Sequence, residues 1–209
     1  VELARWGLIV DDSAGAPLDR QPAGIFAGLL LEFAAGDCDP IGLLAALKHP
    51  LAAFGLSRPA CRQAARILEV GLLRGNRVAG GLGALRPALA AARTAATDPK
   101  ARHVTAAHRR LAAEDWDRAD NLLAAIEVAL APLLDLLRGA EAISVSALAG
   151  ALQRSLTAAA TDEDGSDREL WLGEPGRALA GLLDELMTDD GGLTLSPGEA
   201  PALVATLMA

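Results

Sequence analysis

Helix-start signals recur along this chain, and they constrain its fold more than any other feature. A side chain that can cap a helix is followed closely by proline at Asp39-Pro40, at Ser57 with Pro59, and at Asp98-Pro99. The cap accepts a hydrogen bond from a free amide of the first turn, and proline fits that turn because it needs no donor there. Each signal therefore predicts the start of a helix.

The composition agrees with this pattern. Of the 209 residues, 52% are hydrophobic but only 3% are aromatic, so the core has to be built from Leu, Ala and Val. Ala and Leu rank high in helix propensity, whereas the aromatic and β-branched residues that favour strands are scarce. We expect an all-α fold, a multi-helix array of about eight helices, with at most one short strand near the N-terminus.

The spacing of apolar residues places the helices. We expect them near residues 21–36, 39–49, 57–75, 85–96, 98–110, 114–137, 144–160, 168–188 and 197–208. Pro132 should bend the longest of them, because its ring replaces a backbone donor. An acidic Gly/Ser run at 161–167 predicts an exposed loop. The apolar runs are broken well before the ~20 residues needed to cross a bilayer.

Charge is distributed unevenly along the chain, although the net charge is only −8. Residues 1–57 carry 3 basic and 7 acidic side chains, residues 58–110 carry 11 and 2, and residues 111–209 carry 5 and 18. A basic middle between acidic flanks suits a surface that faces phosphates. Equally, it suits ion pairing between the helices of the chain itself.

The sequence lacks the residue patterns that indicate a catalytic, phosphate-binding or metal-binding site. The Gly81-Leu82-Gly83 stretch lacks the Lys-Ser or Lys-Thr of a phosphate-binding loop, and Asp162–Gly165 fails the ligand spacing of a calcium loop. His103 and His108 are five apart, which turns them to different faces of a helix. We interpret Cys38 and Cys61 as buried free thiols. The chain is therefore not expected to be an enzyme by itself.

Residues 6–18 form the most informative segment for function. A short apolar run, Leu8–Val10, ends in Asp11-Asp12 and a Ser/Gly/Pro turn, as a buried strand does where it enters a loop. The residues before it resemble the last turn of a helix, and the chain has no initiating Met at its start. We expect it to be a piece of a larger protein.

Several motifs resemble those of one known family. They are Trp6-Gly7 with Val10-Asp11-Asp12-Ser13-Ala14-Gly15 and Pro17-Leu18, Leu43–Leu51 followed by Gly55-Leu56, Leu68-Glu69 with Leu73-Arg74-Gly75, Leu170-Trp171 with Gly173-Glu174, Gly176 and Ala178-Leu179, and Leu195-Ser196-Pro197 to Leu207. On these residues the chain resembles the AddB subunit of bacterial AddAB-type helicase–nucleases, in its alphaproteobacterial form.

The resemblance implies a domain organisation and a function. Residues 1–18 would be the junction from a missing motor domain, and residues 19–209 a helical auxiliary domain inserted in the second motor domain. The family, whose layout is similar to UvrD-like helicases, resects double-strand DNA ends for recombination, with DNA and an AddA-type subunit as partners. ATP, Mg and an iron–sulfur cluster would belong to other parts of the complex, leaving this chain with no catalytic residue, metal or cofactor. Its location would be the bacterial cytoplasm, at the nucleoid, with no membrane partner.

The resemblance makes the basic middle a candidate DNA contact. The candidate residues form two groups, which are Arg58, Arg62, Arg66, Arg74 and Arg77, and Lys100, Arg102, Arg109 and Arg110. Such contacts would depend on salt and ignore base sequence. The alternative is a helical protein-interaction scaffold without nucleic-acid contact. Ion pairs between Arg58–Arg77 and the carboxylates of 162–190 would favour the scaffold, and arginines gathered on one open face would favour DNA. Trp6, Trp116 and Trp171 are interpreted as core or interface anchors.

Overall fold

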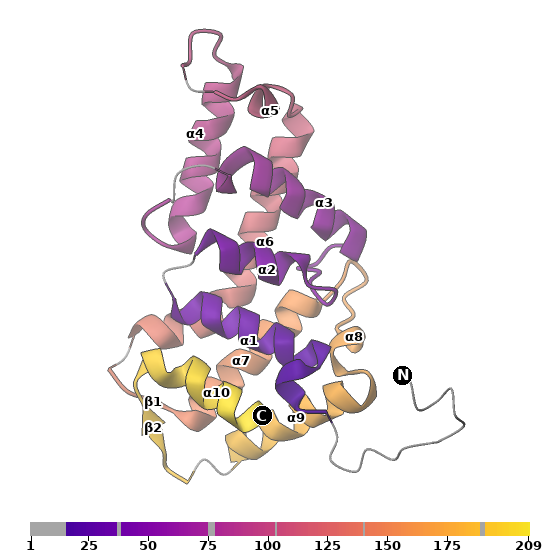
Figure 1. The fold of residues 1–209 in the computed structure, drawn as a ribbon, viewed down its shortest axis with the longest axis vertical. Coiled ribbons are helices and arrows are strands. Elements are labelled where there is room, and N and C mark those ends of the chain that lie inside the picture. Colours follow the sequence, from indigo (N-terminus) through magenta and orange to yellow (C-terminus); the bar gives the residue numbers. More distant parts are fainter. Residues whose placement is uncertain (1–15, 37–38, 75–77, 103, 140, 189–190) are drawn as a thin grey trace, which may run out of the picture.

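The computed structural model describes residues 16–36, 39–74, 78–102, 104–139, 141–188 and 191–209. Within these ranges the chain forms ten α-helices, joined by turns and short helical segments, and one small antiparallel sheet. The prediction of an all-α fold is therefore confirmed. The described chain is elongated, and its longest helix runs from near the top of the molecule down past its middle (Figure 1).

The small sheet differs from the expectation of at most one strand near the N-terminus. Its strands are β1 (Ile143–Ser144) and β2 (Thr194–Leu195), and the predicted strand at residues 8–10 lies outside the described residues. The amide of Val145 also donates to the carbonyl of Leu193, at 3.1 Å. Two-residue strands leave no alternating pattern in a sequence, so this pairing could not be anticipated.

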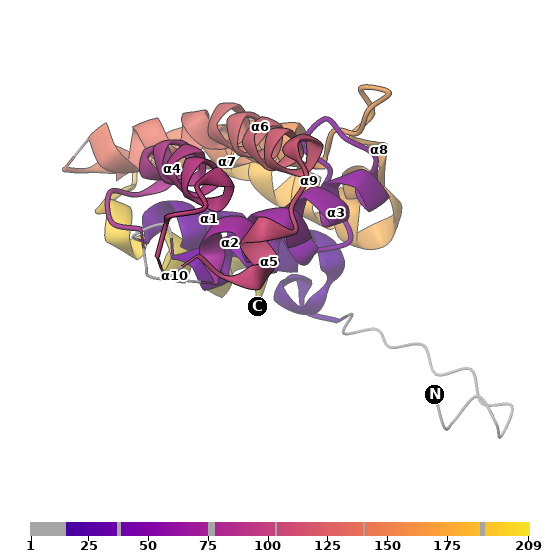
Figure 2. The same ribbon diagram turned by 90° about the horizontal axis from the view of Figure 1, so that it is seen from above.

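Three helices form one layer of the molecule. These are α1 (Pro22–Ala35), α2 (Pro40–Lys48) and α3 (Arg58–Leu68), which cross in front of the long helix α6 (Ala113–Gly139) (Figure 1). Seen from above, α6 and α7 lie on one side and this layer on the other (Figure 2). The long helix thus supports the layer that carries the first group of candidate cations.

The two ends of α6 have different neighbours. At the upper end it packs beside α4 (Leu85–Thr97), with the short α5 (Ala106–Arg109) above (Figure 1). At the lower end it packs against α7 (Val145–Ala160), which in turn contacts α9 (Gly173–Thr188). Helix α10 (Ala200–Met208) covers α1.

Capping side chains account for two of the predicted helix starts. The carboxylate of Asp39 accepts hydrogen bonds from the amides of Ile41 and Gly42, at 3.0 and 3.3 Å, and α2 ends at Lys48, before Pro50. The hydroxyl of Ser144 accepts from the amide of Ala147, at 3.1 Å, at the start of α7. These local predictions are confirmed.

Two predicted helices are wrong in detail. Asp98 does not begin a helix that reaches Arg110, because its carboxylate accepts the amide of Lys100 in a tight turn, at 2.8 Å, and α5 begins only at Ala106. The helix expected at 168–188 is divided into α8 (Arg168–Trp171) and α9, because Leu172 between them is extended and Gly173, where α9 begins, has a φ of +72° that glycine adopts readily.

One hydrophobic core joins the described helices, from Ala23 on α1 to Met208 on α10. It consists mainly of Leu and Ala, as the composition predicted. Trp116 on α6 is buried and packs close to Gly71 and Leu111 in the upper part of the molecule. Trp171 closes α8 in the lower part, where its ring nitrogen donates to the carboxylate of Asp167, at 2.8 Å. Both therefore act as anchors, while Trp6 lies outside the described residues.

Candidate nucleic-acid interface

Helix α3 presents the first group of candidate cations. Its apolar face, with Cys61, Ala65 and Leu68, is buried in the core, whereas Arg62 and Arg66 are exposed on the other side. Neither arginine forms an ion pair with any residue that the structure describes. Arg62 and Arg66 are thus available to an anionic partner.

Arg58 lies one helical turn before Arg62 in the same series of arginines, but its environment is different. Its Nη1 is 3.9 Å from Oδ2 of Asp162, its Nη2 is buried without a hydrogen-bond partner in the described ranges, and only 24% of the side chain is exposed. The guanidinium thus turns towards the 161–167 loop. It is therefore the weakest contact candidate of the described members of this group.

A π-helical turn, Glu69–Leu73, follows α3 and changes the environment of Arg74. The Glu69 carboxylate accepts hydrogen bonds from Nε and Nη2 of Arg74, at 3.1 and 3.0 Å, and lies 2.8 Å from Nζ of Lys48. The hydrogen bonds from Lys48 and then Arg74 hold the pKa of Glu69 below its usual value. Arg74 is thus partly neutralised, and Lys48 is a member of this cluster that sequence analysis missed. Arg77 lies outside the described residues.

The second group of candidates lies around the tip of the molecule, between α4 and α6. Lys100, Arg102 and Arg110 are exposed and form no ion pair with any residue in the described part of the chain. Arg109 differs from them, because its Nη1 donates to the carbonyl of Asp98 and its Nη2 to that of Ala101, at 3.3 and 3.1 Å. Within the described residues, three cations of this group therefore have no ion-pair partner, and the fourth, Arg109, binds backbone carbonyls.

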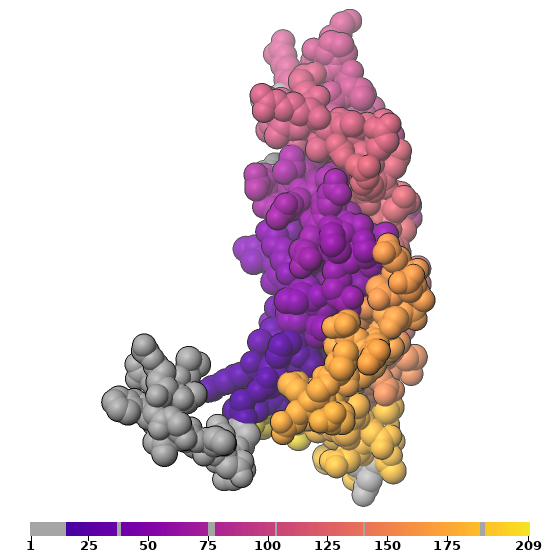
Figure 3. Space-filling view, turned by 90° about the vertical axis from the view of Figure 1, so that its right-hand side faces the viewer, coloured from indigo at the N-terminus to yellow at the C-terminus, as the bar shows by residue number. Residues whose placement is uncertain are grey.

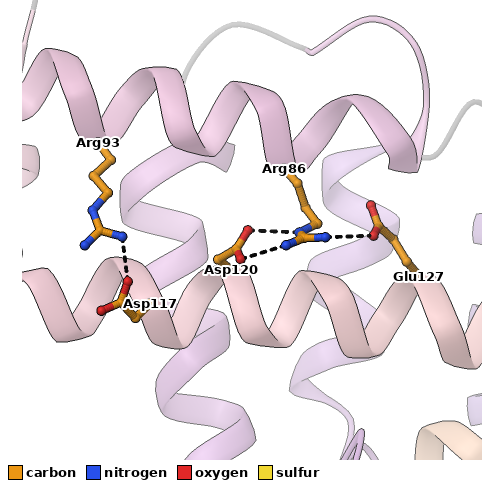
Figure 4. Close-up of polar contacts among 5 residues, drawn as sticks. All are labelled: Arg86, Arg93, Asp117, Asp120 and Glu127. Carbon is orange, nitrogen blue, oxygen red and sulfur yellow. Dashed lines mark hydrogen bonds and ion pairs between the residues drawn. The ribbon is translucent and has the colours of Figure 1, made fainter.

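Ion pairs between α4 and α6 neutralise the other basic residues of this region (Figure 4). The fork of Arg86 binds both carboxylate oxygens of Asp120, at 2.9 and 2.8 Å, and Nη1 approaches Glu127 at 3.7 Å. Arg93, about two turns after Arg86 on α4, pairs with Asp117, about one turn before Asp120 on α6. The hydrogen bond from Arg86 keeps the pKa of Asp120 below its usual value. The carboxylates of Asp117, Asp120 and Glu127 on α6 thus form ion pairs with α4 and not with the candidate cations.

Within the described residues, the acidic loop at 161–167 pairs with the candidate cations only at the start of α3, where Asp162 faces Arg58. Residues 58–110 occupy the middle and the top, whereas the segment from 161 onwards begins beside the middle and continues to the bottom (Figure 3). Of the pairs that would favour the scaffold, between Arg58–Arg77 and carboxylates of 162–190, the described residues show only Arg58 with Asp162. Five candidates therefore have no ion pair with the described part of the chain, namely Arg62, Arg66, Lys100, Arg102 and Arg110.

Two further properties of the described residues bear on chemistry. Burial raises the pKa of the Cys61 thiol to about 11, which keeps it protonated and unreactive at neutral pH, while Cys38 lies outside the described residues. A search of the described His, Cys, Asp and Glu side chains finds no group of three that could hold a metal ion. Each helix in the described ranges is too short or too polar to cross a membrane.

Comparison with protein-family models, with curated proteins and with solved structures finds no match to this chain.

Proposed function

We propose that this chain is a non-catalytic helical domain of an AddB-type subunit in a bacterial helicase–nuclease that resects double-strand breaks. Its role would be to contact duplex DNA while an AddA-type partner and other parts of the complex carry out the ATP-dependent chemistry. One observation carries the DNA contact. Five cations of the basic middle are exposed and lack an ion pair within the described residues, although the chain is acidic overall.

The type of contact follows from the residues. Arg and Lys side chains without carboxylate partners bind phosphate oxygens, and such contacts position a protein on DNA without reading its sequence. The chain has only three Phe, three Trp and no Tyr, and Trp116 is buried, so stacking on single-stranded bases has little support. Duplex backbone is therefore the proposed target. The proposed location is the bacterial cytoplasm, at the nucleoid.

The proposal can be tested by DNA binding of the 209-residue chain. The probe is a short fluorescein-labelled duplex, with binding followed by anisotropy over a series of salt concentrations. We expect binding at low salt that weakens as the salt concentration rises. A plot of log affinity against log salt concentration should have a negative slope, which becomes shallower by roughly 0.9 for each phosphate contact removed. Charge reversal at the tip (Lys100→Glu, Arg102→Glu, Arg110→Glu) and on α3 (Arg62→Glu, Arg66→Glu) should each weaken binding.

A matched control separates these contacts from net charge. Arg168 and Arg177 are exposed on α8 and α9, away from the candidate groups, so Arg168→Glu with Arg177→Glu changes the charge by the same amount as the α3 pair. This variant should bind nearly as well as the original chain. Absence of binding at low salt, or equal losses in the control and the α3 variant, would overturn the DNA contact.

A protein-interaction scaffold is the second candidate function, and the α4–α6 ion pairs favour it. Arg86 and Arg93 show that part of the basic middle is matched by the chain's own carboxylates. In this case the chain should form a complex with the AddA-type subunit that survives charge reversal of all five unpaired cations. Size-exclusion chromatography of the mixed proteins, without DNA, measures this directly.

A further inference from the structure

Helix α5 is too short to hold its own position. It has four residues, Ala106–Arg109, and isolated helices shorter than about 12 residues are marginal in water. Its start is capped by Thr105, whose hydroxyl accepts from the amide of His108, at 3.2 Å. The orientation of α5 must therefore come from contacts with other elements.

Two neighbouring side chains of α5 make these contacts in different directions. Nε2 of His108 lies 2.9 Å from the carbonyl oxygen of Val70 in the π-helical turn, and because a carbonyl only accepts, this nitrogen is the donor. The same ring meets Trp116 edge-on, with 6.3 Å between the ring centroids. Arg109 instead reaches the loop that follows α4, residues 98–102, here called the tip loop. There its guanidinium donates to the carbonyls of Asp98 and Ala101.

The tip loop is folded around the contact with Arg109. The carboxylate of Asp98 accepts the amide of Lys100, and the carbonyl of Asp98 accepts the amide of Ala101, at 3.2 Å. That same carbonyl accepts Nη1 of Arg109. One guanidinium therefore ties α5 to the backbone that carries Lys100 and Arg102. Its planar fork can donate to two carbonyls at once, whereas a lysine ammonium lacks this fixed geometry.

We infer that Arg109 is a positioning residue of the phosphate-binding surface, which holds Lys100 and Arg102 in place instead of contacting DNA itself. This inference rests on the proposed DNA contact, and it changes the role that the sequence suggested for Arg109. His108 completes the arrangement, because it ties α5 to the turn that ends α3. Helix α5 thus links the loop that carries Lys100 and Arg102 to the π-helical turn that follows α3.

The test compares a charge-preserving with a charge-removing substitution at two adjacent sites. Arg109→Lys and Arg109→Ala are measured beside Arg110→Lys and Arg110→Ala, each by anisotropy with the labelled duplex and by amide hydrogen exchange of Lys100 and Ala101. If Arg109 positions the loop, both of its variants raise the two exchange rates by about tenfold, the effect of losing a charge-assisted hydrogen bond, and weaken binding equally.

At Arg110 the pattern should differ. A phosphate contact partly tolerates lysine, so Arg110→Lys should lose clearly less binding than Arg110→Ala, and neither should alter the exchange rates. The positioning role is overturned if Arg109→Lys binds like the original chain, or if the Arg109 variants leave exchange at Lys100 and Ala101 unchanged.

The experiment also separates this inference from the proposed function. If the original chain does not bind the duplex, the DNA contact fails and the positioning role fails with it. If the original chain binds, and Lys100→Glu with Arg102→Glu weakens binding while Arg109→Ala changes neither binding nor exchange, the DNA contact stands and only the role of Arg109 is refuted.

Discussion

The guanidinium of Arg86 binds both carboxylate oxygens of Asp120, two residues that are 34 positions apart and lie on facing helices. This fork, with Arg93 and Asp117 on the same interface, fixes α4 beside the upper half of α6 (Figure 4). Because the tip loop follows α4 directly, the register between these two helices decides where Lys100 and Arg102 are presented.

Acid should weaken this link. Since the pKa of Asp120 is lowered in the folded chain, its contribution to stability is present above the unfolded pKa, about 3.8, and is lost as the pH falls through the folded value. Asp120→Asn should therefore lower the free energy of unfolding near neutral pH, by less than ~1 kcal/mol because 41% of the side chain is exposed and screened. When the free energy of unfolding is measured by urea denaturation at a series of pH values, its decrease at acid pH should also be smaller in this variant.

The control for this prediction is Asp135→Asn, because Asp135 is exposed on the same helix and forms no ion pair with any residue that the structure describes. It should leave both the neutral stability and the decrease at acid pH nearly unchanged. Identical behaviour of the two variants would contradict a specific role for the fork.

Gly71→Ala should destabilise the fold. A Cβ atom at this position would lie 3.1 Å from Cζ3 of Trp116 and 3.4 Å from Cδ1 of Leu111, so the buried ring has to shift. Overpacking of this kind costs roughly 1–3 kcal/mol, which thermal or urea denaturation measures. Gly181→Ala on α9 is the matched control, because nothing lies within 4 Å of its Cβ, and a gain of about 0.5–1 kcal/mol is expected there. A loss at both positions would refute the steric explanation.

Ser155→Ala should stabilise the chain, contrary to the usual effect of a core substitution. Ser155 is fully buried on α7, and its hydroxyl has no hydrogen-bond partner among the residues that the structure describes. Its replacement by alanine removes an unsatisfied polar group without leaving a large cavity, a gain of about 1 kcal/mol. Ser144→Ala at the start of the same helix should cost about 1 kcal/mol, because it removes the cap on the amide of Ala147. Urea denaturation that gives the same sign for both variants would contradict these assignments.

Cys61 should react with thiol reagents only when the chain unfolds. The side chain is fully buried, and its raised pKa leaves almost no thiolate at neutral pH. In a Cys38→Ser variant, labelling by a disulfide reagent should follow the unfolding rate and become rapid in urea. The Cys61→Ser variant supplies the rate for Cys38 alone. Rapid labelling of Cys61 in the native chain would show that α3 is less well packed than described.

Local patterns predicted the fold well where a helix start depends on its own residues. Asp39 and Pro40 show this, since cap and proline occur together and α2 begins there. The same pair at Asp98-Pro99 failed, because an aspartate can close a turn on the amide two residues ahead as readily as it caps a helix. The choice depends on how α4 ends, which the two residues do not encode.

The candidate site was less predictable than the fold. Charge spacing identified Arg62 and Arg66 on the exposed side of α3, but it treated Arg58, Arg74 and Arg109 as their equals. The structure separates them by their partners, which are Asp162, Glu69 and two backbone carbonyls. The Asp162 and carbonyl partners come from other elements, and the Glu69 contact depends on the π-helical turn. Spacing along a helix therefore cannot reveal them.

The positions of the two described tryptophans give this protein a built-in optical readout. Trp116 is buried in the upper part of the molecule, Trp171 is hydrogen-bonded to Asp167 in the lower part, and the chain contains no tyrosine. With Trp6 replaced by phenylalanine, single-tryptophan variants would emit from one end of the molecule at a time. The order in which the two ends lose their structure is then visible without any attached dye.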